Sequence, residues 1–463
     1  MTPNDIFDSE STICAVSTPH GCGGIAVIRV SGDKAIEIVQ RVWRGKNLTA
    51  LAGHTAHFGE IVDPEHPDDV LDECIATLFR GPRSFTGEDT VELSIHGSRW
   101  IQREVLALLV RQGARLALPG EYTRRAMLNG RLDLAQAEAV ADIIASSSRA
   151  AHRLAATQLK GVFSQRLASL RERLLTLASL LELELDFSEE DVEFADRSEL
   201  YRLSEEIAEA VGSLHKSYSA GAAIKDGIPV AIAGATNAGK SSLLNRLLSD
   251  DRAIVSDIHG TTRDTIEETL EVGDYLFRFI DTAGLRDTTD RIEQLGIERS
   301  LAAIDKARIV ILVVDPQSPT PRQLIDSIRA KTDAAVIIFQ NKQDITAPLS
   351  PILPDLPGAT IVKGSAMTGE GVDDLLKQLV AEIESTQTGA EDGVMVTNAR
   401  HAAILAEAHQ SALKVMDSLS SSLPPEFTAQ HLRQTISHLS AITGDIPTPE
   451  ILNNIFTHFC IGK

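Results

Sequence analysis

The chain has 463 residues, of which 43% are apolar, and this length suffices for about three domains that each bury a core. Its 44 Lys and Arg against 65 Asp and Glu give a net charge of −21, and only 4% of the residues are aromatic. This composition excludes bulk electrostatic binding of nucleic acid and an extended stacking platform for single strands, so an RNA contact must be local or shared with a partner.

The sequence shows no targeting or metal-binding pattern. No apolar run approaches the length of about 18 residues that a membrane helix needs, and the N-terminus reads MTPNDIFDSESTI, with acids where a signal peptide carries basic residues. The cysteines lack CxxC spacing, which predicts neither a zinc site nor a disulfide framework. We therefore expect a cytoplasmic protein with no membrane contact. The cysteines are Cys14, Cys22, Cys74 and Cys460.

Residues 1–120 mix short β-rich runs with turns, which predicts an α+β domain. Ile25–Val30 ends at a Ser-Gly pair, and Val91–Ile95 ends at a His-Gly pair, as strands commonly end at turn residues.

Residues 121–220 are expected to form the first part of a helical domain. Leucines recur there at alternating steps of three and four, which places them on one face of a long helix. Burial in a bundle is the main interpretation, although a seam between two copies has the same spacing. The leucines are Leu167, Leu170, Leu174, Leu177 and Leu181.

Residues 221–384 alternate apolar runs with helical sequence, which predicts an α/β domain with a parallel, doubly wound sheet. After a polar stretch, residues 385–463 return to helical sequence at 398–419 and 427–459, so the α/β domain is expected to be inserted into the helical one. The expected strands are Pro229–Ala233, Phe277–Ile280, Ile309–Val314, Ala334–Phe339 and Thr360–Val362.

A phosphate-binding loop follows the first of these strands. Gly234 to Ser241 read GATNAGKS and lead into the helical sequence SLLNRLL. In such a loop backbone N–H groups surround the phosphates, Lys240 reaches the β- and γ-oxygens, and Ser241 ligates Mg²⁺. The residues expected at the phosphates are Asn237, Ala238, Gly239, Lys240, Ser241 and Ser242.

A second phosphate sensor follows the strand FRFI. Asp281 is placed to hold the metal through water, and the Gly284 N–H to face the γ-phosphate. Thr262 is the candidate for a second hydroxyl on Mg²⁺, while an ordinary turn is the alternative for Thr261 taken alone. The sensor reads Asp281, Thr282, Ala283 and Gly284.

Base selection is expected after the next two strands. Asn341, Lys342 and Asp344 belong to the string NKQD, in which a carboxylate accepts hydrogen bonds from N1–H and the 2-amino group of guanine. Adenine offers no such pair of donors, so this element predicts GTP. Ser365 and Ala366 suit a backbone contact to the guanine O6. NKQD alone would suit a polar turn equally well, but four motifs in this order on successive strand ends favour a GTPase.

Together these motifs resemble the MnmE (TrmE) family of bacterial tRNA-modification GTPases. The resemblance covers nearly the whole chain, and its most selective strings are RVSG, GPRSFTGEDTVELSIHG, PGEYTRRAMLNGRLDLAQAE and the terminal CIGK. It implies an N-terminal folate-binding domain, a helical bundle and an inserted Ras-like G domain. It also implies a homodimer that acts with MnmG, an FAD-dependent partner, on tRNA. The product is an aminomethyl or carboxymethylaminomethyl group on C5 of the wobble uridine, with a 5-formyl or 5,10-methylene tetrahydrofolate as one-carbon source.

The resemblance also implies a K⁺-stimulated mechanism. Asn237 matches the asparagine that helps to bind K⁺, an ion that neutralises charge between the β- and γ-phosphates. Glu293 matches the acid that positions the attacking water, and Leu285, which stands where other GTPases carry glutamine, cannot orient water. Without the resemblance, Asn237 would suit a turn and Glu293 a solvated helix face. The loop that covers K⁺ matches Ser256, Ile258 and Thr261.

For folate, the family's binding positions fall on Arg29, Glu92, Arg131 and Lys463. A carboxylate pairs with the pterin edge and cations suit the glutamate tail, whereas a surface salt bridge is the plain alternative for Arg29 and Glu92. Position 131 is a lysine in many members. Cys460 is a candidate catalytic thiol or a buried structural cysteine. Two other functions stay open, a ribosome-assembly GTPase that acts as a binding switch and a scaffold for the flavoenzyme.

Overall fold

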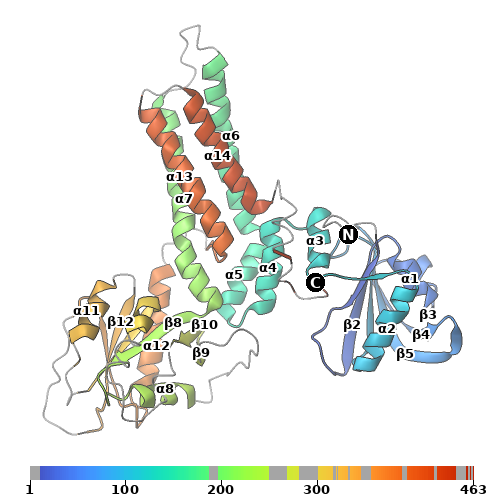
Figure 1. Ribbon diagram of the computed structural model, residues 1–463, viewed down its shortest axis with the longest axis horizontal. Coiled ribbons are helices and arrows are strands. Elements are labelled where there is room, and N and C mark those ends of the chain that lie inside the picture. The colour runs from blue at the N-terminus through green and yellow to red at the C-terminus, as the bar shows by residue number, and fades with distance from the viewer. Residues whose placement is uncertain are drawn as a thin grey trace. The chain divides into compact units, whose positions relative to one another are not determined.

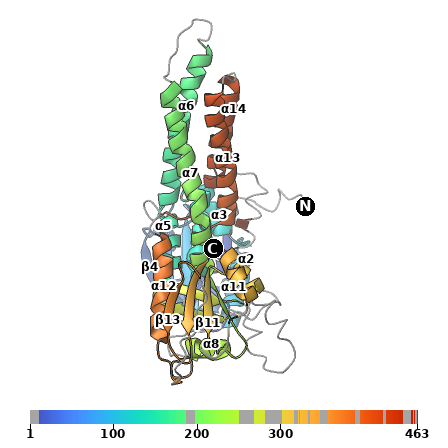
Figure 2. The same ribbon diagram turned by 90° about the vertical axis from the view of Figure 1, so that its left-hand side faces the viewer.

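The computed structural model describes residues 11–186, 197–249, 268–280, 301–315, 320, 322–331, 334–345, 356–387, 394–421, 425–444, 455–456, 459 and 462. The chain forms two compact units, labelled by element in Figures 1 and 2. One unit comprises Met1–Ile144, Gln158–Leu175 and Ile436–Lys463, and the other comprises Ala145–Thr157 and Thr176–Thr435.

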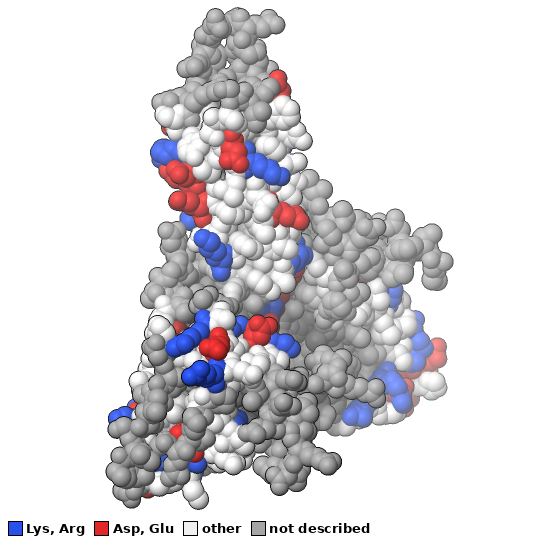
Figure 3. All heavy atoms as spheres, turned by 60° about the vertical axis from the view of Figure 1, so that its left-hand side comes forward, with Lys and Arg blue, Asp and Glu red and all other residues white. Residues whose placement is uncertain are grey.

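Among the described residues, the surface charges are mixed and the helices are unsuited to a membrane. On the face seen in Figure 3, Lys and Arg side chains are interspersed with Asp and Glu and form no continuous basic area among the residues described. In the same part of the chain, every helix is too short or too polar to cross a bilayer.

The first unit contains a seven-stranded sheet in the order β3-β4-β5-β6-β2-β1-β7, antiparallel except between β1 and β7. The two expected strands are confirmed, and each is longer than expected. One face of the sheet is buried under α1 (Ala35–Arg41) and α2 (Arg99–Arg111), because alternate residues such as Ile28 and Leu93 join one apolar core. The strands are β1 Ile13–Val16, β2 Ile25–Ser31, β3 Trp43–Arg44, β4 Thr55–Asp63, β5 His66–Phe79, β6 Thr90–His96 and β7 Arg115–Leu116.

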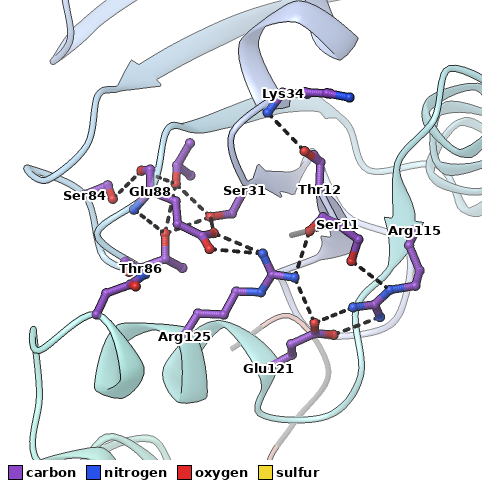
Figure 4. A network of polar contacts seen from close by, with 12 residues as sticks. Ser11, Thr12, Ser31, Lys34, Ser84, Thr86, Glu88, Arg115, Glu121 and Arg125 are labelled. Atoms are coloured by element: carbon purple, nitrogen blue, oxygen red, sulfur yellow. Dashed lines mark hydrogen bonds and ion pairs between the residues drawn. The ribbon is translucent and has the colours of Figure 1, made fainter. Parts of the chain in front are cut away.

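A buried network of charges fixes the loop 81–89, which joins β5 to β6, against α3 (Glu121–Leu128) (Figure 4). The Arg125 guanidinium donates to both carboxylate oxygens of Glu88, at 3.1 and 3.3 Å, and to Glu121 at 3.1 Å. Arg115 donates to both oxygens of Glu121, at 2.6 and 3.1 Å. Burial alone would raise the pKa of Glu121, but hydrogen bonds from Arg115 and a backbone N–H, together with the two arginine charges, lower it.

We expect Arg125→Met to destabilise this unit by about 3–5 kcal/mol, because Arg125 is 5% exposed and its loss removes the cation shared by Glu88 and Glu121, whose side chains are 14% and 4% exposed. Urea unfolding followed by tryptophan fluorescence measures the effect. The chain has 2 tryptophans, Trp43 and Trp100, and both lie in this unit. Arg103→Met is the control, since Arg103 is an exposed arginine and should change stability by less than about 0.5 kcal/mol. Equal midpoints for the two variants would contradict the prediction.

The helices that follow confirm the leucine stripe. All five leucines lie in α6 (Val162–Asp186) and are 2% exposed or less, which is the burial expected of a bundle within one chain. In the second unit, α7 (Arg197–Asp226) packs along α13 (Ala399–Ser420) (Figure 1). The remaining helices between the two sheets in the sequence and after the second are α4 Leu134–Ala145, which lies in the first unit up to Ile144, and α5 Arg149–Leu159 and α14 Pro425–Thr443, which are each divided between the units.

The helical sequence expected at 427–459 overlaps α14, which ends before Gly444. α14 stops at Thr443, where Gly444 adopts a φ of 82° against the side chain of Leu134, a conformation that glycine accepts without strain. Two prolines, Pro447 and Pro449, follow in the sequence and disfavour continuation of a helix. The helical sequence expected at 427–459 is thus confirmed as far as Thr443, and residues 445–454 lie outside the described residues.

The second unit contains a six-stranded sheet in the order β13-β12-β11-β8-β10-β9. All five expected strands are confirmed and run parallel, but β9, which was not predicted, pairs antiparallel to β10 and makes the sheet mixed. Its sequence ETLEV buries only Leu270, so it lacks the apolar run that marks the inner strands. The strands are β8 Ile228–Gly234, β9 Glu268–Val272, β10 Tyr275–Phe279, β11 Ile309–Val314, β12 Ala335–Gln340 and β13 Thr360–Lys363.

Helices cover both faces of this sheet. Along β11, Ile311 packs with residues of α8 (Lys240–Ser249) and α12 (Val372–Gln387), whereas Leu312 packs with residues of α11 (Arg322–Ala330). The doubly wound arrangement is thus confirmed. It directs the carboxyl ends of the parallel strands to one edge, where ligands bind in folds of this class.

Candidate functional site

The loop between β8 and α8 carries the motif expected to bind phosphate. The Lys240 ammonium donates to the carbonyl oxygens of Gly234 at 3.1 Å and Ala235 at 2.8 Å, so it lies across the loop. Burial lowers the pKa of Lys240, and phosphate oxygens beside it would favour the charged form. Gly239 has a φ of 98°, and a Cβ there would overlap the side-chain nitrogen of Asn341. Asn237 has a φ of 62°, a conformation that asparagine tolerates better than most residues.

Asn341 joins three of the predicted motifs. Its side-chain nitrogen donates to the Ala238 carbonyl at 2.8 Å, and its side-chain oxygen accepts from the Ala366 backbone N–H at 2.8 Å. The residue is 3% exposed, so both bonds are shielded from water. The structure therefore brings the phosphate loop, NKQD and the Ser365-Ala366 turn together at one edge of the sheet, because each follows a parallel strand.

Two further side chains belong to this site and were missed from the sequence. Asp315 follows β11 directly and accepts from the Lys342 ammonium at 2.6 Å. Arg246 of α8 donates to the carbonyl oxygens of Ala366, at 3.4 Å, and Met367. The position of Asp315 directly after a buried strand, shared with the other motifs, was a usable signal. Nothing in the sequence marked Arg246, which is one basic residue on an amphipathic helix.

The remaining predicted residues of this site divide into two groups. Ser241 and Ser242 begin α8, Ser365 is buried in its turn, and Asp344 is exposed beside Asn341. The others lie outside the described residues: Ser256, Ile258, Thr261, Thr262, Asp281, Thr282, Ala283, Gly284 and Glu293.

A second cluster occupies the sheet of the first unit. Arg29 of β2 and Glu92 of β6 stand opposite each other in the register, and the Arg29 Nε donates to Glu92 at 2.9 Å. The guanidinium lies 5.4 Å from the ring centre of Phe85 and 5.5 Å from that of Tyr122, whose hydroxyl donates to the Arg29 carbonyl at 2.7 Å. The salt-bridge alternative for this pair is thus realised. The two side chains are 17% and 26% exposed, so they remain accessible to a ligand.

The other predicted residues of this cluster are only partly described. Arg131 is exposed, and its Cγ lies 3.4 Å from where a Cβ on Gly87 would stand, so it borders the loop that carries Phe85. Near the C-terminus, the Gly462 carbonyl accepts from the Ser17 hydroxyl at 3.0 Å, just beyond β1. Its sequence neighbours Cys460 and Lys463 lie outside the described residues.

Two family models match this chain over most of its length. The model of the MnmE helical domain matches residues 134–460, and that of the GTP-binding protein TrmE N-terminus matches residues 12–131. The chain is 50% identical to the tRNA modification GTPase MnmE of Parabacteroides distasonis, over 98% of this chain and 100% of the relative. It is 46% identical to the protein of the same name from Cytophaga hutchinsonii, over 100% of both. Among solved structures, the G domain of the T. maritima FeoB iron transporter is 25% identical, covers 34% of this chain and 98% of that chain, and has a TM-score of 0.25.

Proposed function

This chain belongs to the MnmE family of tRNA modification GTPases, and from that premise we propose that it hydrolyses GTP to drive modification of the wobble uridine of certain tRNAs at C5. The observation that carries the proposal is the buried Asn341 side chain, which ties the phosphate loop to the turn expected at the guanine base. A nucleotide site of this construction needs all three motifs at one sheet edge.

The roles at the nucleotide follow from the chemistry of the side chains. Lys240 and the backbone of the loop would hold the phosphates, and Asp344 the N1–H and 2-amino edge of guanine. Ser241 and Thr262 would ligate Mg²⁺, with Asp281 holding it through water, and this ion would supply charge neutralisation at the phosphates. Glu293 would accept a hydrogen bond from the attacking water and so orient it.

We also propose K⁺ stimulation within a homodimer. Asn237 and the loop carrying Ser256, Ile258 and Thr261 would hold the ion. The left-handed backbone of Asn237 supports this role, since such strained positions often serve a ligand.

For the first unit we propose a folate derivative held by Arg29, Glu92, Arg131 and Lys463. The accessible Arg29–Glu92 pair supports this, because a carboxylate and a guanidinium match the polar edge and the anionic tail of a folate. Cys460 is proposed as a thiol near that ligand, and the contact of Gly462 with Ser17 supports its placement on this sheet.

The layout we propose is an N-terminal domain at 1–120, a helical domain at 121–220 and 385–463, and a G domain inserted at 221–384. The packing of α7 on α13 supports the insertion, since these helices lie directly before and after the α/β segment. We also propose that the chain acts in the cytoplasm and shares its tRNA contact with a flavoenzyme such as MnmG, and the net charge of −21 supports a shared contact because it disfavours electrostatic binding of tRNA by this chain alone.

Steady-state GTP hydrolysis in K⁺ or Na⁺ buffers of equal ionic strength tests the mechanism. We expect K⁺ to accelerate turnover at least about tenfold, and Asn237→Ala to abolish the difference, because the ion would stabilise charge formed in the transition state. Asn245→Ala, an exposed asparagine of α8, is the control and should keep the response to K⁺. Slow hydrolysis at the same rate in K⁺ and Na⁺ would favour the alternative function, a ribosome-assembly GTPase that acts as a binding switch and depends on a partner for catalysis.

A further inference from the structure

We propose that Asp315 is a positioning residue for recognition of the guanine base, and that it acts through Lys342. The inference rests on the proposed guanine site and adds a residue to it. Asp315 lies at the carboxyl edge of β11, between β8, which leads into the phosphate loop, and β12, which leads into NKQD. It therefore stands between the two halves of the nucleotide site.

The ion pair between the two residues is close and largely shielded. The Lys342 ammonium lies 2.6 Å from a carboxylate oxygen of Asp315, whose side chain is 5% exposed, while that of Lys342 is 30% exposed. A buried carboxylate that loses its cation is strongly disfavoured, so the lysine is held where the aspartate stands. The pair thus fixes the far end of the Lys342 side chain.

The backbone of Lys342 is strained. Its φ of 63° is a left-handed conformation that side-chain-bearing residues adopt at a cost, so the surrounding contacts must hold it there. Asn341 anchors the residue before it through two buried hydrogen bonds, and the Gln343 backbone N–H donates to the Gly364 carbonyl at 3.2 Å after it. Asp315 supplies the attachment of Lys342 itself. Asp344, the residue expected to read the base, is the last residue of this turn.

Loss of the Asp315 charge should therefore relax the turn and misplace the Asp344 carboxylate. The penalty should fall on the base contact that depends on Asp344, which involves the 2-amino group of guanine. Inosine nucleotides lack this group but keep the N1–H, so the difference between the GDP and IDP constants reports on the contact to the 2-amino group. A carboxylate that only stabilised the fold would affect guanosine and inosine nucleotides equally.

The test measures dissociation constants for fluorescent GDP and IDP with the full chain and with Asp315→Asn. We expect GDP binding to weaken about tenfold to a hundredfold, the range for loss of a charged hydrogen bond, and IDP binding to weaken much less, so that the preference for GDP shrinks. Lys342→Met should give the same result, and the double variant should bind no worse than either single variant. Asp374→Asn, which breaks an exposed ion pair with Lys377 on α12, should leave both constants unchanged.

Three outcomes would decide against the inference: an unchanged GDP constant, equal losses for GDP and IDP, or additive effects in the double variant. If Asp315→Asn does not fold, the double variant Asp315→Leu/Lys342→Met decides, since it leaves no buried carboxylate without its cation. If the proposed guanine site is itself wrong, the unaltered protein will show no preference for GDP over IDP, which distinguishes that result from a failure of the inference about Asp315.

Discussion

Replacing Glu293 by alanine is expected to lower GTP hydrolysis by about two to four orders of magnitude while GTP binding is kept, the range that a positioned acid or base contributes. The reason lies in the segment after the second phosphate sensor. Leu285 follows Gly284 there and has no polar group with which to orient water, so another residue must do so. Glu293 lies outside the described residues, and its role therefore depends on this experiment.

Single-turnover hydrolysis at saturating GTP measures the chemical step for Glu293→Ala, and fluorescent GTP titration measures binding separately. Glu298→Ala is a matched control, since it removes a glutamate five positions further along the same segment. We expect Glu298→Ala to hydrolyse GTP at close to the normal rate. Unchanged turnover in Glu293→Ala would remove that residue from catalysis and would direct attention to a residue supplied by a partner.

Asn341→Ala is expected to weaken GDP and GTP binding by two orders of magnitude or more. The change leaves the Ala238 carbonyl and the Ala366 N–H without their buried partner, and each unpaired group costs about 1–3 kcal/mol. Two loops of the nucleotide site lose their attachment at the same time. The effect should therefore appear in nucleotide affinity as well as in the stability of the domain.

Thermal unfolding with and without GDP measures the loss of GDP affinity. A ligand that binds only the folded state raises the melting temperature, and the rise is larger when the ligand concentration exceeds the dissociation constant by a larger factor. We expect the unaltered protein to show a clear rise and Asn341→Ala to show almost none. Gln378→Ala removes a side-chain amide of α12 that bonds Glu382 at 2.7 Å and should keep the full rise. A normal rise in Asn341→Ala would refute the bridging role.

The inner strands of the α/β sheet were predictable because strands buried on both faces read as continuous apolar runs, as in Ile309–Val314. The edge strand β9 was not predictable, since its sequence ETLEV contains two glutamates and a threonine and buries only Leu270. The end of α14 at Thr443 was not placed from the sequence, because the texture of helical residues does not give the end of a helix, although Gly444 and the prolines after it are typical stop signals.

Some residues of the candidate sites could be predicted from the sequence and others could not. Motif residues were found because their spacing and their place after a strand are fixed by the chemistry of phosphate and base. Arg246 and the pairing of Asp315 with Lys342 were not, because they depend on which strand ends become neighbours in the folded sheet. Arg29 and Glu92 were singled out through the family resemblance, whereas their direct pairing follows from the register of β2 and β6.

The bond between Asn341 and Ala238 joins residues 103 positions apart in the chain. At a synthesis rate of about 5–20 residues per second, the phosphate loop leaves the ribosome roughly 5–20 s before the residue that anchors it. A nascent chain that has not been synthesised beyond Ala366 lacks one of the two attachments of the Asn341 side chain, so the two loops of the nucleotide site are not yet joined. Until then, the position of β8 depends on its pairing with β10 and β11 and on the apolar core.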